Sequence, residues 1–420
     1  MGQLGLSEEE SLDGLGEAPS DFLSDRLGWI LAGVWRGEGL VILRRPTGPI
    51  WPLKLGGKVG MSQTEQIKAA LHGKKKTSMK QNLLGTGSTL LNLACSGSIE
   101  GGFLAGHYYF FVGDTTSGKT WLSLTCFAEA TLKPEVWGDY RFIYDGAEFG
   151  ALMDIGKYFG KEVAKRMEPP EGSRMTPIYS QTVEEMYYHI DDALEKGRPF
   201  VYVQDSQDAL SSSAEQRKFA ELKKAHRRGK DSTGSWGDNK AKVHSANIRK
   251  LMGPLKDSGS ILIILNQTRD SFDIFSPSSY SGGRALKFYA TLQLWSSVRR
   301  RLKKTVRGKE RQVGIVAKVA VKKNRLTGKE RMVEIPIYNS HGMDDVGSCI
   351  DYLVDEKFWV KSGSNSVCVK GLGPEQVMKR DAIIRMTEED GAEDDLRELV
   401  GKVWEEIESA SAVKRKRRYE

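Results

Sequence analysis

The chain has 420 residues, with 63 lysines and arginines against 55 aspartates and glutamates, which gives a formal net charge of +8. Hydrophobic residues make up 39% of it and charged residues 28%, a globular composition that excludes a disordered chain and a fibre. No apolar run approaches the roughly 18 residues that cross a bilayer, and the first residues lack the basic start of a secretory signal. We therefore expect a cytoplasmic protein without a membrane partner, built from two or three structural units.

Cysteine and histidine usage argues against two classes of site. The four cysteines, Cys95, Cys126, Cys349 and Cys368, are far apart and form no CxxC pair. A disulfide framework is therefore not expected, which fits a reducing compartment. The six histidines are scattered along the chain, so the sequence does not predict a zinc site.

The first 80 residues carry weak patterns. Residues 1–60 join an acidic, Gly/Ser-containing start to a proline-rich end, and we expect a poorly ordered extension there. Residues 61–80 combine a helical spacing, with Ile67 and Leu71 on one face, and a run of three lysines. This pattern predicts a helix followed by a basic linker.

Short apolar runs alternate with amphipathic stretches from residue 81 to residue 336. Four runs of this kind predict strands buried on both faces, namely Tyr108–Val112, Arg141–Tyr144, Phe200–Gln204 and Ile261–Leu265. Helices are expected over Thr120–Thr131 and Val183–Lys196. The alternation predicts an α/β fold with a mostly parallel twisted sheet flanked by helices.

The sequence pattern changes after residue 336. Residues 337–410 read as short elements with strongly charged surfaces, which predicts a small C-terminal α/β domain. Residues 411–420 contain a run of lysines and arginines and are expected to be a solvated basic tail.

A phosphate-binding pattern lies between the first strand and the first helix. Gly113-Asp114-Thr115-Thr116-Ser117-Gly118-Lys119-Thr120 matches GxxxxGK[ST]. The glycines allow successive backbone N–H groups to point into one concavity, and the helix N-terminus adds partial positive charge. Lys119 would bind the β- and γ-phosphates, and the Thr120 hydroxyl would bind Mg²⁺. The pattern therefore predicts ATP and Mg²⁺ as ligands.

Polar residues follow the other three strands, at the sheet edge where ligands of open α/β sheets bind. Asp205 follows Gln204 and is expected to act on Mg²⁺ through the ion's water ligands. Glu148 and Asp145 compete for the role of the base that orients the attacking water, and we favour Glu148. Gln267 follows the fourth strand and could sense the γ-phosphate and signal it to the next loop.

Together these motifs resemble the RecA-type recombinase family, phage members included, over roughly residues 81–410. The segments that carry the resemblance are Gly85–Leu90, Tyr144–Glu148, Val203–Ser206, Leu265–Arg269, Gly282–Ala290 and Val321–Arg325. Gly282–Ala290, GGRALKFYA, is the most specific of them. The resemblance implies an ATP-dependent filament on single-stranded DNA that pairs it with homologous double-stranded DNA in recombination and repair.

Carried over residue by residue, the resemblance assigns further roles. Glu148 is the catalytic base, Asp205 the Walker B acid and Gln267 the amide that links nucleotide to DNA. Lys323 and Arg325 would reach the ATP of a neighbouring subunit, with Phe288 at that interface. Residues 61–73 would supply an arm that docks on a neighbour in the filament.

Two polar stretches, 210–247 and 268–281, correspond in the family to DNA-binding loops. Basic side chains there would neutralise phosphates, and aromatic side chains would stack on unpaired bases. The candidate DNA contacts are Arg227, Arg228, Trp236, Arg269, Phe272 and Phe275. Residues 214–228 could instead form a helix with a solvated charged face. A third basic cluster over 299–309 could contact duplex DNA or be an exposed hairpin.

Two other classes of function share part of this pattern. A hexameric RecA-fold helicase or translocase would keep the phosphate loop and Asp205 without needing the GGRALKFYA segment. A DNA-binding accessory ATPase without strand exchange would keep the basic stretches and tolerate loss of Glu148. DNA-stimulated ATP hydrolysis and the form of the assembly separate the three.

Overall fold

The computed structural model describes residues 82–171, 178–229, 239–270, 278–363, 366–373, 375–416 and 418–419. The extension expected at 1–60 and the helix and linker expected at 61–80 lie outside these residues. Residues 77–420 form one compact unit. Among the described residues, no helix combines the length and apolarity that crossing a bilayer requires.

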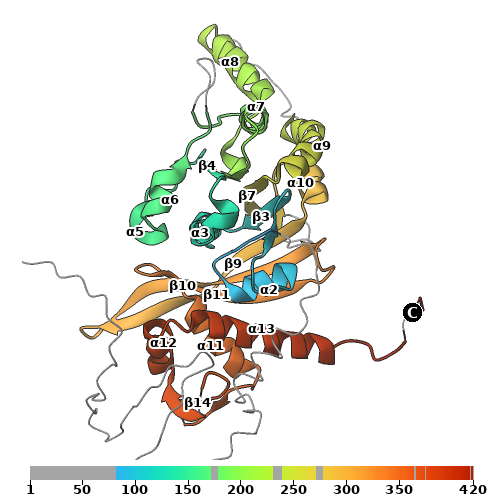
Figure 1. Cartoon of the computed structure of the whole chain (residues 1–420). Helices are drawn as coiled ribbons and strands as arrows, with labels where there is room; N and C mark the ends of the chain where they lie inside the picture. Colours follow the sequence, from blue (N-terminus) through green and yellow to red (C-terminus); the bar gives the residue numbers. More distant parts are fainter. Residues whose placement is uncertain are drawn as a thin grey trace, which may run out of the picture. The chain divides into compact units, whose positions relative to one another are not determined.

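A large mixed sheet forms the centre of this unit (Figure 1). Its ten strands run in the spatial order β12 (Gly342–Met343), β11 (Arg331–Tyr338), β10 (Lys309–Asn324), β9 (Leu292–Val306), β3 (Tyr108–Gly113), β7 (Ile261–Asp270), β6 (Phe200–Gln204), β4 (Arg141–Asp145) and β5 (Met167–Glu168), with β8 (Ser278–Tyr280) paired to β7. Strands β9, β3, β7, β6, β4 and β5 are parallel. The four strands predicted from apolar runs are therefore all present and lie side by side, as an α/β fold requires.

Side chains of β3 alternate between two cores, one on each face of the sheet. Tyr109 and Phe111 pack on one side with helix α3 (Lys119–Leu132). Tyr108, Phe110 and Val112 pack on the other with helices α7 (Val183–Glu195) and α9 (Asn239–Ser258). Burial on both faces explains why this strand is a continuous apolar run instead of an alternating one.

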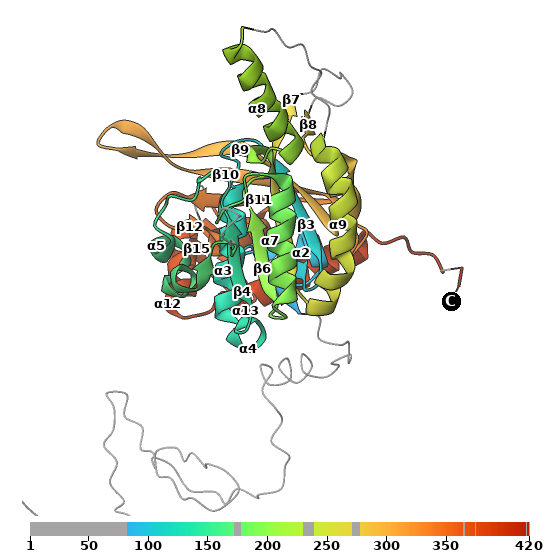
Figure 2. The same cartoon turned by 90° about the horizontal axis from the view of Figure 1, so that it is seen from above.

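Helices cover both faces of the parallel part. Figure 2 shows α7 and α9 side by side over one face, and their residues are in contact. The remaining helices before the long hairpin are α2 (Thr89–Ser96), α4 (Pro134–Trp137), α5 (Ile155–Phe159), α6 (Lys161–Arg166), η1 (Gln207–Ala209), α8 (Ser213–Arg227) and α10 (Arg284–Tyr289), and the pair β1 (Leu83–Leu84) and β2 (Phe103–Leu104) forms a separate small sheet. The predicted helices at 120–131 and 183–196 correspond to α3 and α7.

The antiparallel end of the sheet was not predicted. Strands β9 and β10 form a long hairpin, which continues into β11 and β12. The basic cluster over residues 299–309 forms the outer half of this hairpin and is exposed, which agrees with one of its two predicted structures. Alternating hydrophobicity is weak there because both faces of the projecting half are exposed.

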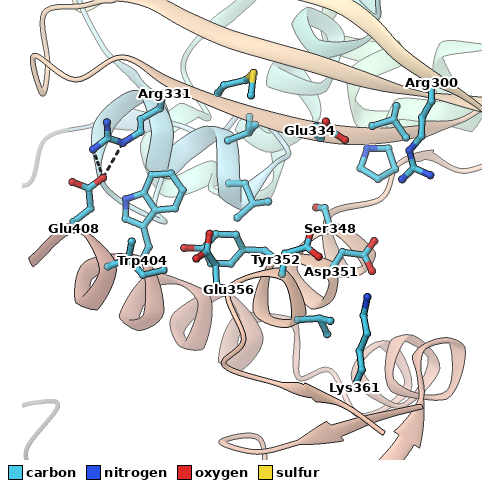
Figure 3. A pocket seen from close by; sticks show the side chains of 18 residues that line it. Arg300, Arg331, Glu334, Ser348, Asp351, Tyr352, Glu356, Lys361, Trp404 and Glu408 are labelled. Carbon is cyan, nitrogen blue, oxygen red and sulfur yellow. Dashed lines mark hydrogen bonds and ion pairs between the residues drawn. The ribbon is translucent and has the colours of Figure 1, made fainter. Parts of the chain in front are cut away.

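The C-terminal residues form helices α11 (Asp345–Asp355), α12 (Arg380–Glu389) and α13 (Glu393–Ala410) with a small antiparallel sheet of β13 (Val360–Lys361), β14 (Ser366–Val369) and β15 (Gln376–Lys379). Helix α11 contacts β11 and α2, so this part packs against the central sheet. A cavity of about 630 Å³ lies between β11, α11 and α13 (Figure 3). Arg331 and Glu408 pair at its rim, and none of the phosphate-loop residues lines it.

Candidate functional site

The phosphate loop connects β3 to α3 at the carboxyl edge of the parallel strands. Thr116 has φ 64° and Gly118 has φ 90°, so the backbone turns through the left-handed region twice within three residues. Gly118 precedes α3 without a side-chain cap on the first N–H groups of the helix. A Cβ on Gly113 would lie 2.3 Å from the Ser296 carbonyl oxygen, so only glycine fits there. The loop thus curls tightly before the N-terminus of α3, the arrangement that binds phosphate.

Lys119 lies at the base of this loop and is largely buried. Its Nζ donates 2.8 Å hydrogen bonds to the carbonyl oxygens of Gly113 and Asp114. Burial lowers its pKa, and the nearby carboxylates of Asp205 and Glu148 oppose that shift. The two carbonyl oxygens are neutral acceptors and compensate the buried ammonium only in part. A bound triphosphate would supply the anionic partner that Lys119 lacks.

The surroundings of the loop fit a nucleotide. A cavity of about 370 Å³ adjoins it, lined by residues 116–121 together with Met153, Gln312, Ile315, Ile337, Tyr338 and Asn339. The Ser117 hydroxyl is buried and has no hydrogen-bond partner among the described residues. An unsatisfied buried hydroxyl beside a concave loop marks a place where a polar ligand compensates.

Thr120 and Asp205 meet across the site. Thr120 Oγ1 donates a 2.6 Å hydrogen bond to Asp205 Oδ2, which also accepts a 2.7 Å bond from the Tyr144 hydroxyl. Burial raises the pKa of Asp205, and these two hydroxyl donors oppose the rise. A hydroxyl oxygen and a carboxylate are hard oxygen ligands of the kind Mg²⁺ binds alongside substrate phosphates and water. No group of three or more acidic, His or Cys ligands occurs in the described residues, so an all-protein metal cage is absent from them.

The two competing carboxylates differ in environment. Asp145 is fully buried and accepts hydrogen bonds from the Ser180 backbone N–H at 2.9 Å, the Ser180 hydroxyl, and the Tyr202 hydroxyl at 2.7 Å. Glu148 is exposed in the turn after β4. The geometry favours Glu148 over Asp145, because the Asp145 carboxylate is buried and already accepts three hydrogen bonds, whereas Glu148 is exposed.

Gln267 lies beside Glu148 at the same edge. Its Nε2 donates a 2.8 Å hydrogen bond to Glu148 Oε1, and its backbone N–H donates a 2.6 Å bond to Asp208 Oδ2. The next residue, Thr268, donates a hydrogen bond to Asp114 in the phosphate loop. The end of β7 therefore touches both the phosphate loop and the candidate base.

Lys323, Arg325 and Phe288 form a separate cluster. Lys323 Nζ donates 2.7 Å bonds to the carbonyl oxygens of Lys287 and Phe288, and Arg325 donates a 2.8 Å bond to the latter. The Phe288 ring is 62% exposed, and the Arg325 guanidinium lies 5.9 Å from its centroid. Burial, followed by the charges of Arg325 and Lys287, lowers the pKa of Lys323 to about 8.

This cluster lies at the opposite edge of the sheet from the phosphate loop. Asn324 pairs with Leu292, and Leu292 pairs with Tyr109 near the start of β3, whereas Lys119 follows the end of β3. At roughly 3.3 Å per residue, the two ends of this strand are about 15 Å apart. Lys323 and Arg325 are therefore not part of the nucleotide site of their own subunit.

The two stretches that are expected to bind DNA contain regular secondary structure at their ends. Helix α8 covers 213–227 and α9 starts at 239, so the helix considered for 214–228 is present, and the role of its charged face stays a prediction. Thr268 to Asp270 pair in β-strand register with Ser278 to Tyr280. Arg227 and Arg228 are exposed at the end of α8. Trp236, Phe272, Phe275 and the Arg269 side chain lie outside the described residues.

Several residues at the site escaped the sequence interpretation. Ser206 donates a hydrogen bond to Glu148, and Tyr144 and Asp208 hold Asp205 and Gln267 as described above. Tyr144 and Ser206 belong to the motif segments Tyr144–Glu148 and Val203–Ser206, and Asp208 lies two residues beyond the second, so the signal was present but no role was assigned to them. Ser296 donates a 2.6 Å bond to the Ser117 carbonyl oxygen from 179 residues away, and no local signal indicates it.

Comparisons with known proteins agree with this geometry. A family model described as the RecA N-terminal domain matches residues 220–344. Protein RecA of Gluconacetobacter polyoxogenes is 30% identical over 295 residues, which cover 68% of this chain and 74% of that protein. Protein RecA of Chlorobaculum parvum is 28% identical over 324 residues, covering 74% and 82%. Protein RecA of Mycobacterium ulcerans is 28% identical over 289 residues, covering 67% and 73%.

Proposed function

The chain belongs to the RecA family, and we propose that it is an ATP-dependent DNA recombinase that forms filaments on single-stranded DNA and promotes homologous pairing and strand exchange. The observation that carries this proposal is the contact between Gln267 and Glu148, because it joins the candidate catalytic carboxylate to the start of a candidate DNA-binding stretch. Nucleotide chemistry and DNA binding then share one structural element.

Within one subunit, the phosphate loop would hold the triphosphate of ATP. Lys119 would exchange its two carbonyl partners for phosphate oxygens, and Thr120 with Asp205 would hold Mg²⁺. When bound, Mg²⁺ neutralises charge that develops on the phosphate oxygens. Glu148 would orient and deprotonate the attacking water, with its carboxylate fixed by Ser206 and Gln267.

Between subunits, Lys323 and Arg325 would complete the site of a neighbour. Their place at the far edge of the sheet supports this, since they cannot serve the nucleotide of their own subunit. The neighbouring Phe288 ring offers an exposed apolar contact for the same interface. A site completed only in the oligomer makes filament assembly depend on ATP.

ATP hydrolysis measured with and without single-stranded DNA tests the proposal, together with negative-stain imaging and a strand-exchange assay. We expect DNA-stimulated turnover, helical filaments and exchange of a homologous strand. Closed rings that translocate would indicate a helicase, and DNA binding without stimulated turnover would indicate an accessory ATPase. Lys119→Ala should abolish the ATP-dependent step, and Arg325→Ala should lower turnover when mixed with intact subunits.

A further inference from the structure

Three consecutive residues after Asp205 contact three different parts of the fold. Ser206 donates a hydrogen bond to the Glu148 carboxylate. Gln207 contacts His244 in α9, with 3.0 Å between the two Nε2 atoms. Asp208 accepts the 2.6 Å hydrogen bond from the Gln267 backbone N–H. This short segment, residues 206–208, therefore joins the catalytic edge to α9 and to β7.

The segment also reaches the end of the second candidate DNA-binding stretch. The Ser281 hydroxyl lies within hydrogen-bond distance of both Gln207 Oε1, at 3.0 Å, and Asp208 Oδ1. Asn266 donates a 2.9 Å bond to the Ser281 carbonyl oxygen. Residue 281 is thus held from three sides, directly after β8.

Two glycines after Ser281 allow the chain to pack closely against α9, at a junction formed by residues 206–208, 281–283 and the start of α9. A Cβ on Gly282 would lie 3.2 Å from the Gln207 amide, and a Cβ on Gly283 would lie 2.6 Å from Ala241 Cβ. Both glycines have positive φ, at 88° and 78°. The chain therefore passes between Gln207 and the first turn of α9 with no room for a side chain.

His244 is the link between this junction and α9. Its side chain is fully buried, and its Nδ1 lies 2.9 Å from the Tyr187 hydroxyl in α7. Burial lowers the pKa of His244 to about 3, with Lys240 as a smaller cause, so the ring is neutral at physiological pH. A neutral ring can accept from the Gln207 amide at Nε2 and donate to Tyr187 from Nδ1, which satisfies both contacts.

We propose that Gln207 and His244 are positioning residues that transmit the nucleotide state sensed by Gln267 to the start of α9, so that both candidate DNA-binding stretches respond together. This inference rests on the proposed function. The stretch after Gln267 receives the signal along its own backbone. The first stretch ends at α9 and has a path through Asp208, Ser281, Gln207 and His244. Gln207 and His244 are buried and Asp208 and Ser281 are half-buried, and a hydrogen-bonded chain of this kind can carry such coupling because each group has few alternative partners.

The test uses the full-length protein and measures two main quantities, with the affinity for the analogue alone and the thermal midpoint as controls. The first is the coupling factor, which is the ratio of dissociation constants for a fluorescent oligothymidine without and with a non-hydrolysable ATP analogue. The second is the amide hydrogen exchange of residues 239–247 with and without the analogue, in the absence of DNA. His244→Phe keeps a ring but loses both hydrogen bonds, His244→Gln keeps both kinds of contact, and Gln207→Met keeps length without polarity. His107→Phe serves as a matched control, because His107 directly precedes β3 and its Nδ1 lies 2.9 Å from the Ala105 carbonyl oxygen, away from residues 206–208.

We expect His244→Phe and Gln207→Met to lower the coupling factor about tenfold, or to one if the wild-type factor is smaller. Analogue binding without DNA should stay within about twofold, and His244→Gln and His107→Phe should keep the coupling. The analogue should slow exchange at 239–247 in the wild type and not in His244→Phe. Thermal midpoints identify a variant that fails to fold. If one of the two relay variants, His244→Phe and Gln207→Met, fails to fold, the other still tests the inference.

Three results would overturn the inference. The first is a coupling factor that persists in both relay variants. The second is a loss of analogue affinity as large as the loss of coupling, which would indicate a general defect. The third is wild-type exchange at 239–247 that ignores the analogue. A wild-type protein that binds no oligonucleotide would defeat the proposed function, while the exchange measurement would still decide the fate of the relay.

Discussion

Gln267 Nε2 donates a 2.8 Å hydrogen bond to Glu148 Oε1, although β7, which carries Gln267, and β4, which precedes Glu148, are not neighbours in the sheet. Strand β6 lies between β7 and β4, so the bond passes across its carboxyl end. Ser206, which follows β6, donates to the same carboxylate. Glu148 is therefore held by donors from two strand ends, and any movement of β7 changes the position of the candidate base.

Gln267→Ala should separate DNA stimulation from the chemical step. The variant removes the amide donor but leaves Ser206 on the carboxylate, so DNA-free hydrolysis should fall only about threefold while DNA-stimulated hydrolysis falls about a hundredfold. Steady-state rates with and without oligothymidine measure both values. Gln267→Glu, which matches the size but places two carboxylates together, should be at least as impaired. Equal losses in both rates would show that Gln267 serves catalysis alone.

Asp205→Asn should weaken Mg²⁺ dependence more than Tyr144→Phe. Both changes alter the hydrogen bonds at one oxygen, Asp205 Oδ2, but only the first removes the negative charge beside Thr120. We expect the Mg²⁺ concentration for half-maximal hydrolysis to rise at least about tenfold in Asp205→Asn, and less than about threefold in Tyr144→Phe. A magnesium titration of the hydrolysis rate measures this. Similar shifts in the two variants would mean that orientation of the carboxylate matters more than its charge.

The parallel strands and the phosphate loop could be predicted because their signals are local. Burial on both faces makes β3 and β6 continuous apolar runs, and the loop follows β3 directly. The neighbours that hold the site residues could not be predicted in the same way. Ser296 reaches the phosphate loop because β9 pairs with β3, a pairing set by the whole sheet and not by nearby residues.

The antiparallel end of the sheet and helix α8 show a second limit. The outer half of the β9–β10 hairpin and the whole of α8 bury almost no side chains. Hydrophobic periodicity in the sequence therefore gives almost no signal for these elements. The capping box of Ser212 and Glu215 was the readable signal for α8. The buried junction around Gln207 and His244 left no motif, since its members come from three elements.

Lys323 should make assembly depend on pH. Its pKa of about 8 in the subunit means that the ammonium is largely deprotonated above that value. A neighbour's triphosphate would favour the charged form, so filament assembly should weaken as pH rises from 8 towards 10. Folding stability changes in the opposite direction, because the unfolded chain, with the higher lysine pKa, binds more protons over this range. Light scattering with ATP analogue and DNA, and denaturation midpoints, measure the two trends.

Lys323→Arg is the matched variant for this pH effect. A guanidinium stays protonated across the range, so the variant should lose the dependence near pH 8 while keeping a cation at the interface. Lys323→Gln should assemble weakly at every pH. If wild-type assembly is constant from pH 7 to 9.5, Lys323 does not contact the neighbour's nucleotide.

Asp345 should be important for the attachment of the C-terminal helices to the core. Its carboxylate accepts 2.7 Å hydrogen bonds from both the backbone N–H and the hydroxyl of Thr89, at the start of α2, and a 3.3 Å bond from Arg397 of α13. Asp345→Ala leaves these donors without their acceptor and should lower the free energy of unfolding by about 3 kcal/mol. Asp394 forms an ion pair with Arg397, but its side chain is 96% exposed. Asp394→Ala should therefore change the free energy of unfolding by less than about 0.5 kcal/mol. Denaturant unfolding compares them, and equal midpoints would contradict the prediction.

Two basic surfaces are candidates for the proposed contact with DNA. Helix α8 projects away from the sheet (Figures 1 and 2), and none of its residues is buried. Arg217, Lys224 and Arg228 recur at spacings that place them on one helical face, and all three are exposed. In the β9–β10 hairpin, by contrast, Lys303 pairs with Glu310 and Arg299 pairs with Glu334. The face of α8 is therefore the better candidate for single-stranded DNA, since α8 lies within the first candidate stretch, 210–247.

Salt dependence distinguishes these surfaces. Each cation that neutralises a phosphate of single-stranded DNA contributes about 0.7 to the slope of log affinity against log salt. Lys224→Gln combined with Arg228→Gln should therefore reduce the slope for oligothymidine by about 1.4. Lys304→Gln combined with Arg311→Gln removes a cross-strand pair of cations from the hairpin and should leave that slope unchanged while reducing the slope for duplex DNA. If the hairpin variant instead changes oligothymidine binding and the α8 variant does not, single strands bind the hairpin and the charges of α8 are only a solvated face.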